Sequence, residues 1–211
     1  MALAVDALQL GQIGTNCYLV RRDRTATDAV VVDPAADATE IRLALASSGA
    51  TCAAILLTHS HYDHFGALAD LAEGTDASVW LPERELVVFR RPEDVFAGIP
   101  LRAYDGAATT LSGGETVDAA GIQFQVLHVP GHSPGHLAYY ADGCLFSGDV
   151  LFSGSVGRTD LPFGDWDQLL DSIRALAAAY PPETVVYSGH GPQTTLGAEL
   201  ARNPFLAELR T

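Results

Sequence analysis

The sequence predicts an α+β fold in which two face-to-face β-sheets are covered by helices on both outer sides, a four-layer αββα sandwich. Short apolar runs that stop at turn-forming residues recur along the chain and indicate buried strands. Helical patterns lie between several of these runs, whereas between Thr109 and Tyr140 strand signals follow one another with only turns between them. This mixture of βα units and consecutive strands is typical of two sheets with covering helices.

The chain has 211 residues, of which 48% are hydrophobic, and this is enough to build a buried core. It contains no internal repeat and no Pro/Ser-rich linker. We therefore expect a single domain over residues 1–211.

Five strands are expected, each a short aliphatic or β-branched run closed by turn-forming residues. They are Ala29–Val32, Ala53–Leu57, Ile122–Val129, Cys144–Phe146 and Thr184–Tyr187. An Asp or a His follows just beyond the end of each strand, namely Asp33, His59, His132, Asp149 and His190. Strand ends that meet at one sheet edge would bring these side chains into one cleft.

Helices are expected between and after these strands. Their predicted ranges are Asp37–Ser47, His64–Ala72, Trp166–Ala179 and Gly197–Arg202. Gly49 is a stop signal for the first helix, and the two prolines after Tyr180 stop the third. The segment from Pro82 to Tyr104 is either a rim that selects substrate or a covering helix, and the sequence leaves both interpretations open.

Charge and cysteine content exclude some classes of protein. The formal net charge is -14, from 26 acidic and 12 basic residues, so the chain lacks the basic surface that nucleic-acid binding requires. No apolar run reaches the length of a membrane span, so no membrane partner is expected. The three unpatterned cysteines are expected to be buried free thiols. Together with an N-terminus that lacks a signal-peptide pattern, they predict a cytoplasmic location. The sequence carries no signal of oligomeric state.

The densest chemical signal is the hexapeptide from His59 to His64, which contains three histidines and one aspartate. In extended backbone, residues i and i+2 share a face, so His59 and His61 are able to bind one metal ion. The chain then turns into a helix near Asp63, which directs Asp63 and His64 to a different point. This geometry predicts two neighbouring metal ions.

Three further candidate ligands, His132, Asp149 and His190, each follow a glycine, which lets the backbone approach closely. With the hexapeptide they complete seven nitrogen and oxygen ligands, enough for two metal ions if one carboxylate bridges. Asp149 is the expected bridge. Such ligands accept zinc, iron or manganese, and we expect two Zn²⁺ ions per chain.

Other polar residues near these motifs are interpreted as structural. His128 and His136 are expected not to bind metal. Arg158 and Asp160 are expected to form a buried ion pair that braces their loop, and Asn203 with the two residues after it is interpreted as a packing and capping element. Taken by itself, Asp33 is interpreted as a cap of the turn before Pro34.

The candidate ligands, with the glycines before them, resemble the five-motif signature of the metallo-β-lactamase superfamily. Three further segments narrow the resemblance: the four residues from Thr15 to Tyr18, from Gly157 to Asp160, and from Asn203 to Leu206. They are similar to the hydroxyacylglutathione hydrolase (glyoxalase II) branch, in its short bacterial form.

This resemblance implies the αββα sandwich and an allocation of the ligands. His59, His61 and His132 would hold the first metal ion and Asp63, His64 and His190 the second, with Asp149 between them. The resemblance also implies that Asp33 supports the ligands, an interpretation favoured equally with its capping of the turn before Pro34. It implies hydrolysis of a small-molecule thioester or related thiol conjugate, such as an S-(2-hydroxyacyl)glutathione, through a metal-bound hydroxide. Asp63 and Asp149 would be the catalytic carboxylates, and Asp63 would orient the hydroxide or relay its proton.

Alternative functions are a persulfide dioxygenase with one iron, a lactonase or β-lactamase, and a non-catalytic metal-binding protein. The last is disfavoured because all seven ligand positions are filled. A serine or cysteine nucleophile is not indicated, because the sequence has no G-x-S-x-G elbow and no base next to a cysteine.

Overall fold

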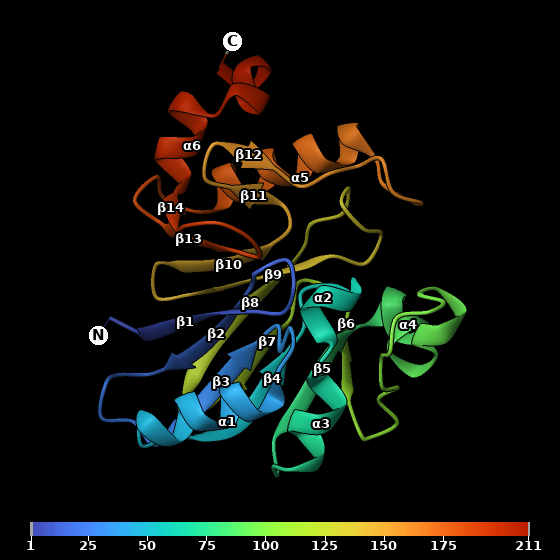
Figure 1. Cartoon of the computed structure of the whole chain (residues 1–211). Helices are drawn as coiled ribbons and strands as arrows, with labels where there is room; N and C mark the ends of the chain where they lie inside the picture. Colours follow the sequence, from blue (N-terminus) through green and yellow to red (C-terminus); the bar gives the residue numbers. More distant parts are fainter. Residues whose placement is uncertain (1, 211) are drawn as a thin grey trace.

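The computed structural model describes residues 2–210, which form two six-stranded sheets and one short hairpin (Figure 1). The first sheet has the strand order β1-β2-β3-β4-β5-β6. Its strands are β1 (Ala4–Leu10), β2 (Thr15–Arg21), β3 (Asp28–Val32), β4 (Thr51–Leu56), β5 (Ser78–Pro82) and β6 (Thr109–Leu111). The strands from β3 to β6 are parallel, and β1 and β2 join them as an antiparallel pair.

The second sheet has the strand order β14-β13-β10-β9-β8-β7. Its strands are β7 (Thr116–Ala119), β8 (Ile122–His128), β9 (Leu137–Ala141), β10 (Cys144–Gly148), β13 (Val185–Ser188) and β14 (Thr194–Thr195). β10 and β13 are parallel, and the other pairs are antiparallel. The hairpin consists of β11 (Leu151–Phe152) and β12 (Ser155–Val156).

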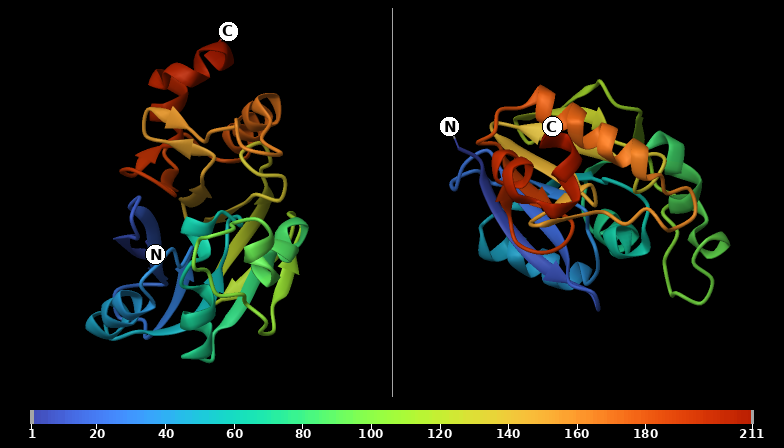
Figure 2. Two further views of the ribbon diagram at one scale, coloured as in Figure 1. Left: turned by 45° about the vertical axis from the view of Figure 1, so that its right-hand side comes forward. Right: turned by 90° about the horizontal axis from the view of Figure 1, so that it is seen from above.

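Helices cover the outer face of each sheet (Figures 1 and 2). On the first sheet these are α1 (Ala38–Ser47), α2 (Tyr62–Phe65), α3 (Leu68–Glu73) and α4 (Leu86–Arg90), with the short 3₁₀ turns η1 (Glu83–Glu85) and η2 (Pro92–Asp94). On the second sheet they are α5 (Trp166–Ala179), α6 (Leu196–Arg202) and η3 (Pro204–Arg210). No helix within residues 2–210 is long and apolar enough to cross a membrane.

Successive side chains of a strand point to opposite faces of the sheet, and this alternation creates the layers. In β3, Ala29 and Val31 face the core under α1 and α3, whereas Val30 and Val32 face the core between the two sheets. A third apolar core lies between the second sheet and α5, where Leu145 packs with residues of that helix. Three apolar cores between four layers confirm the predicted αββα sandwich.

All five predicted strands are present, with ends that differ by a few residues, and the strand-rich stretch from Thr109 to Tyr140 contains β6 to β9. The prediction that the candidate ligands gather at the edge of a single sheet was wrong. The strands before the candidate ligands belong to two sheets, so the ligands gather where the ends of two facing sheets meet rather than at the edge of one sheet.

Three of the four predicted helices are confirmed as α1, α5 and α6, but His64–Ala72 is wrong as one helix. The structure divides it into α2 and α3 at Gly66 and Ala67. Here the backbone packs on the loop after β3: the N–H of Ala67 donates to the carbonyl of Pro34 at 2.9 Å, and a Cβ on Gly66 would lie 2.5 Å from the carbonyl oxygen of Ala35. The two helices therefore separate at the point where the backbone packs against the loop after β3.

Candidate metal centre

The seven candidate ligands come from four loops or turns that follow strands of both sheets. His59 and His61 lie between β4 and α2, and Asp63 and His64 lie in the first turn of α2. His132 follows β8, Asp149 follows β10 and His190 follows β13. All seven side chains lie close together. The structure therefore joins segments more than a hundred residues apart in sequence.

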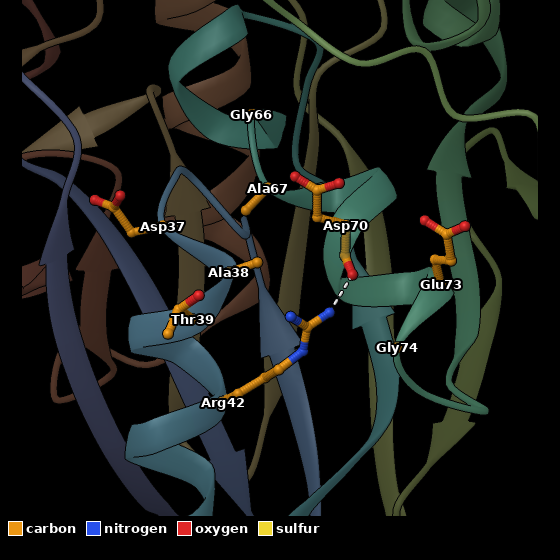
Figure 3. Close-up of a pocket in the computed structure, with 9 residues that line it drawn as sticks. All are labelled: Asp37, Ala38, Thr39, Arg42, Gly66, Ala67, Asp70, Glu73 and Gly74. Atoms are coloured by element: carbon orange, nitrogen blue, oxygen red, sulfur yellow. Dashed lines mark hydrogen bonds between the residues drawn. The ribbon is translucent and has the colours of Figure 1, made fainter.

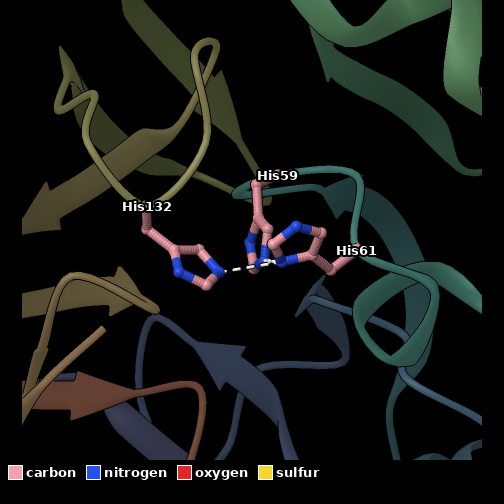
Figure 4. Close-up of side chains that lie close together, drawn as sticks. All are labelled: His59, His61 and His132. Carbon is pink, nitrogen blue, oxygen red and sulfur yellow. Dashed lines mark hydrogen bonds between the residues drawn. The ribbon is translucent and has the colours of Figure 1, made fainter. Parts of the chain in front are cut away.

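His59, His61 and His132 form the first group (Figure 4). Nε2 of His59 lies 3.1 Å from Nδ1 of His61, and Nε2 of His132 lies 2.8 Å from the same Nδ1. The rings come from two sides of the cleft and direct one nitrogen each to a common point. The sequence spacing predicts that His59 and His61 share one metal ion, and the family resemblance implies His132 as the third ligand.

Asp63, His64 and His190 form the second group. Oδ2 of Asp63 lies 3.3 Å from Nε2 of His190 and 3.4 Å from Nε2 of His64. Asp63 and His190 are partly exposed, so this side of the centre is open to solvent.

The carboxylate of Asp149 lies between the two groups. Its Oδ2 lies 3.4 Å from Nε2 of His132 and 3.6 Å from Nε2 of His190. Its Oδ1 lies 3.3 Å from Nε2 of His64. Asp149 therefore contacts members of both groups, which is the position that a bridging ligand requires.

The donor set fits metal ions. Among the described residues, Nε2 of His64 and Oδ1 of Asp149 are buried atoms without a hydrogen-bond partner, which is costly unless a cation binds them. Donor atoms about 3.4 Å apart are what two metal–ligand bonds of about 2.0–2.1 Å span at a tetrahedral angle. The nitrogen and oxygen donors do not select one metal by softness.

Burial keeps His59 and His61 neutral, and neighbouring groups keep both aspartates ionised. Burial and the neighbouring ring of His132 lower the pKa of His61 to about 4, and burial lowers the pKa of His59 well below its ordinary value. Burial acts to raise the pKa of Asp63, but the hydrogen bond from His190 and the charge of His64 prevail and lower it to about 2. Charge and hydrogen bonds similarly hold the pKa of Asp149 well below its ordinary value against burial. Against the effect of burial, nearby carboxylates raise the pKa of His64 well above its ordinary value and that of His190 to about 9, so metal binding there would release a proton from each ring.

Asp33 and Thr58 orient two of the histidines. The hydroxyl of Thr58 donates to Oδ2 of Asp33 at 2.7 Å, and its N–H donates to Oδ1 at 2.8 Å. Nδ1–H of His64 donates to Oδ2 of Asp33 at 2.9 Å. Since the Thr58 hydroxyl hydrogen is used on Asp33, Oγ1 accepts from Nδ1–H of His59 at 3.0 Å. Both rings are thereby oriented with Nδ1 hydrogen-bonded and Nε2, the nitrogen that would bind metal, directed to the centre, so Asp33 supports the ligands.

Two further contacts orient ligands. Nδ1–H of His132 donates to the carbonyl of Arg158 at 2.8 Å. The hydroxyl of Thr15, in β2, donates to Oδ2 of Asp63 at 2.7 Å. The segments around Thr15 and Arg158 were identified in the sequence by resemblance, and the structure shows that both contact candidate ligands.

Glu85 is a supporting residue that sequence reasoning missed. Its buried carboxylate accepts hydrogen bonds from Ser60 N–H at 2.6 Å, Ser133 Oγ at 2.6 Å and Gly135 N–H at 2.8 Å. It therefore joins the loop of His61 to the loop of His132. No local motif marks Glu85, because its three partners lie 25 to 50 residues away along the chain.

The glycine before His190 is required by close approach, as the sequence predicts. A Cβ on Gly189 would lie 2.1 Å from Oδ1 of Asp149 and 2.5 Å from Cε1 of His64. Asn16 holds the same loop by donating from Nδ2 to the carbonyls of Ser188 and Gly191, both at 2.9 Å.

The two remaining histidines belong to none of the described metal-binding groups. His136 is buried behind the centre, where its ring stacks on His59 and its Nε2 accepts from the N–H of Asp149 at 3.1 Å. Burial lowers the pKa of His136 well below its ordinary value, which keeps the ring neutral. Nε2 of His128 contacts the carbonyl of Pro134 at 2.9 Å.

The Arg158–Asp160 pair exists, but the expectation that it is buried was wrong. Its two nitrogen–oxygen distances are both 2.7 Å, while the side chains are 61% and 70% exposed. The backbone carbonyl of Arg158, rather than this pair, makes the contact with His132. Asn203 is a packing element as predicted: Nδ2 donates to Ser155 O and Glu199 Oε2, and Oδ1 accepts from Phe205 N–H.

Two pockets border the centre, and residues of the 82–104 segment line both. One, of about 450 Å³, has His61 in its wall, and the other, of about 640 Å³, has Asp63. The segment thus forms a rim next to the centre. A separate polar hollow lies between α1 and α3 and contains none of the seven ligands (Figure 3).

Comparison with known proteins gives consistent matches. Residues 10–190 match the model of the metallo-β-lactamase superfamily. The hydroxyacylglutathione hydrolase GloC of Haemophilus influenzae is 34% identical over 96% of this chain and 97% of its own length.

Two solved structures are similar over nearly the whole chain. The B3 metallo-β-lactamase BLEG-1 has a TM-score of 0.89 at 38% identity and covers 97% of this chain and 100% of its own. TTHA1623, in a di-iron-bound form, has a TM-score of 0.84 at 40% identity and covers 95% and 100%.

Proposed function

Because this chain belongs to the metallo-β-lactamase superfamily, and is a metallo-hydrolase with a His/Asp metal site, we propose that it hydrolyses a small-molecule thioester of the S-(2-hydroxyacyl)glutathione type. The observation that carries the proposal is the position of Asp149 between two groups of three ligands. The similarity to GloC supports the choice of a thioester.

The proposed centre would hold two metal ions, one on His59, His61 and His132 and one on Asp63, His64 and His190. Metal ions at such a site polarise a carbonyl oxygen and lower the pKa of water. Zinc is our prediction for the resident metal, and the di-iron-bound relative makes iron the alternative.

The residues of this chain have defined parts in the proposed reaction. Asp63 is ionised at neutral pH, so its carboxylate is able to accept a hydrogen bond from the attacking water. Its pKa, lowered to about 2, makes it a weak base, which favours orienting the water over relaying its proton. Thr15 holds Asp63 in place through Oδ2. Attack at the carbonyl carbon breaks the carbon–sulfur bond and yields a carboxylic acid and a thiol. The leaving thiolate is stable, so little help from an acid is required.

The test combines metal analysis with a thioester assay on the purified protein. S-D-lactoylglutathione is the probe, and thiol release is followed with a chromogenic disulfide. We expect two metal ions per chain and turnover that a chelator abolishes. Protein loaded with two metal ions that releases thiol no faster than the uncatalysed reaction would refute the thioester proposal.

β-Lactam hydrolysis is the second candidate, favoured by the structural similarity to BLEG-1. It predicts that kcat/KM for nitrocefin exceeds that for S-D-lactoylglutathione. A third candidate, iron-dependent oxidation of a persulfide, predicts one iron per chain and oxygen uptake with glutathione persulfide. The same metal-loaded preparation serves all three assays, so their rates are directly comparable.

A further inference from the structure

The 450 Å³ pocket beside His61 has largely apolar walls. Its apolar side chains include Val88, Val95, Phe96, Leu161, Pro162 and Phe163. Of its charged residues, Glu85 is buried and bonded to Ser60, Ser133 and Gly135, and Arg84 is exposed. Since Nδ1 of His61 belongs to the first ligand group, the pocket is adjacent to the proposed reaction centre.

Phe163 lies in an unfavourable backbone conformation at the mouth of this pocket. Gly164 N–H donates to the carbonyl of Leu161 at 2.9 Å and closes a turn with Pro162 and Phe163 at its centre. Phe163 has φ +70°, in the left-handed region that this turn position normally reserves for Gly or Asn. The other non-glycine residues with positive φ among residues 2–210 are three aspartates and one alanine. A bulky L-residue is strained in this conformation.

The ring of Phe163 is also unfavourably placed. It is 83% exposed, the largest exposure among the exposed large apolar side chains of residues 2–210. Glycine at this position would relieve the backbone strain and remove an apolar ring from water. The stability of the fold therefore gives no reason for phenylalanine here, and strained residues at the edge of a site indicate a role in function.

We propose that Phe163 and the pocket beside His61 bind an apolar substituent of the substrate, of at least the size of a phenyl group, next to the scissile carbonyl. The proposal rests on the thioester hydrolysis proposed above and names a substrate class for it. Such a substituent covers the exposed ring of Phe163 and contacts the apolar wall from the 82–104 segment. It lies either on the acyl side or on the thiol side of the thioester.

The test measures the preference of the enzyme for an aromatic over a non-aromatic thioester, as the ratio of their kcat/KM values. In one arm, S-phenylacetylglutathione is compared with S-acetylglutathione, and in the other the acetyl thioesters of benzyl mercaptan and ethanethiol are compared. We expect the wild type to prefer the aromatic member in one arm, which identifies the side. Phe163→Gly and Phe163→Asn should reduce that ratio of kcat/KM about 10-fold, the effect typical of one lost apolar contact. Phe163→Tyr, which keeps the ring, should retain it.

Asn tolerates positive φ, so Phe163→Asn removes the ring without asking the backbone to move. The matched control is Leu43→Ala, which removes another exposed apolar side chain outside the pocket and should leave the ratio unchanged. Phe163→Gly should also melt no lower than the wild type. A melting temperature several degrees lower, or unchanged ratios in both arms, would overturn the proposal.

A second readout separates this inference from the proposed function. S-(4-fluorobenzyl)glutathione is a thioether that the enzyme has no means to hydrolyse, and its ¹⁹F signal should broaden with wild-type protein and much less with Phe163→Gly. If no thioester is hydrolysed but this broadening depends on Phe163, the function fails and the pocket assignment stands. If thioesters are hydrolysed but neither the broadening nor the kcat/KM ratio in either arm depends on Phe163, the pocket assignment fails.

Discussion

Nδ1 of His64 donates a hydrogen bond of 2.9 Å to Oδ2 of Asp33, and this bond connects the first sheet directly to the candidate metal centre. Asp33 follows β3 and is buried, with φ +51°. Its other oxygen is held by the N–H of Thr58. The ring of His64 therefore has one orientation, with Nε2 directed to Asp63 and Asp149.

Replacement of Asp33 by Asn should weaken metal binding at the second group. Asn tolerates the backbone conformation, but its single side-chain oxygen cannot accept all the hydrogen bonds that Asp33 accepts from Thr58 and His64. Loss of a residue that hydrogen-bonds to a metal ligand costs about 10–100-fold in metal affinity or activity. Metal titration and turnover measure the effect. The control is Asp37→Asn, at an exposed aspartate with φ +55° and no side-chain capping bond. Equal metal affinity in Asp33→Asn and Asp37→Asn would contradict the role of Asp33.

Replacement of Asp149 by Ala should abolish turnover and lower the metal content below two ions per chain. The carboxylate contacts His64, His132 and His190, so its removal affects both groups at once. We expect turnover to fall more than about 100-fold, which exceeds the loss expected for a residue that only hydrogen-bonds to a metal ligand. Mass spectrometry of the native protein counts the metal ions. Wild-type turnover in Asp149→Ala would refute the bridging assignment.

Replacement of Gly189 by Ala should reduce activity about 100-fold, because a displacement of about 1 Å in a catalytic group has this effect. The new Cβ would lie 2.1 Å from Oδ1 of Asp149, so that carboxylate must move. Gly191→Ala is the control: its Cβ meets nothing within 4 Å, although its φ of +76° adds backbone strain of about 1–2 kcal/mol. Similar activities for the two variants would exclude the steric explanation.

Replacement of Glu85 by Ala should destabilise the fold by about 3 kcal/mol. It leaves buried N–H groups of Ser60 and Gly135 without their acceptor, and each such group costs about 1–3 kcal/mol. Urea unfolding measures the free energy of unfolding. Glu83→Ala, at an exposed glutamate two residues earlier, should change it by less than about 0.5 kcal/mol. Equal stabilities of the two variants would show that Glu85 does not tie the two loops together.

Removal of the metal ions should lower the melting temperature, because ions that bind only the folded state stabilise it by about 4 kcal/mol at about 1,000 times Kd. In this protein their loss would leave the carboxylates of Asp63 and Asp149 without the cations that the donor set fits. Calorimetry before and after chelation, and after addition of Zn²⁺, checks the effect. An unchanged melting temperature in protein shown to be metal-free would contradict it.

Much of the candidate site could be predicted from the sequence, because metal ligation depends on residue types and short spacings. The hexapeptide from His59 to His64 gives a division between two groups, since extended backbone and a helix start direct side chains differently. The glycine before each of His132, Asp149 and His190 predicts close approach, which the position of Gly189 confirms. Alternation and βα units likewise predict the four layers.

The tertiary structure decided what depends on contacts between distant segments. It distributed the ligand-bearing strands over two facing sheets, divided His64–Ala72 at Gly66, and left the Arg158–Asp160 pair in solvent. It also revealed Glu85 between two ligand loops and the strained, exposed Phe163 at a pocket. Local sequence determines the spacing of apolar residues in a segment, and hence its helix or strand pattern, together with the metal-binding side chains that the segment carries. Which surfaces meet depends on how the whole chain packs, and that packing fixes the burial, the partners and the charge of each side chain.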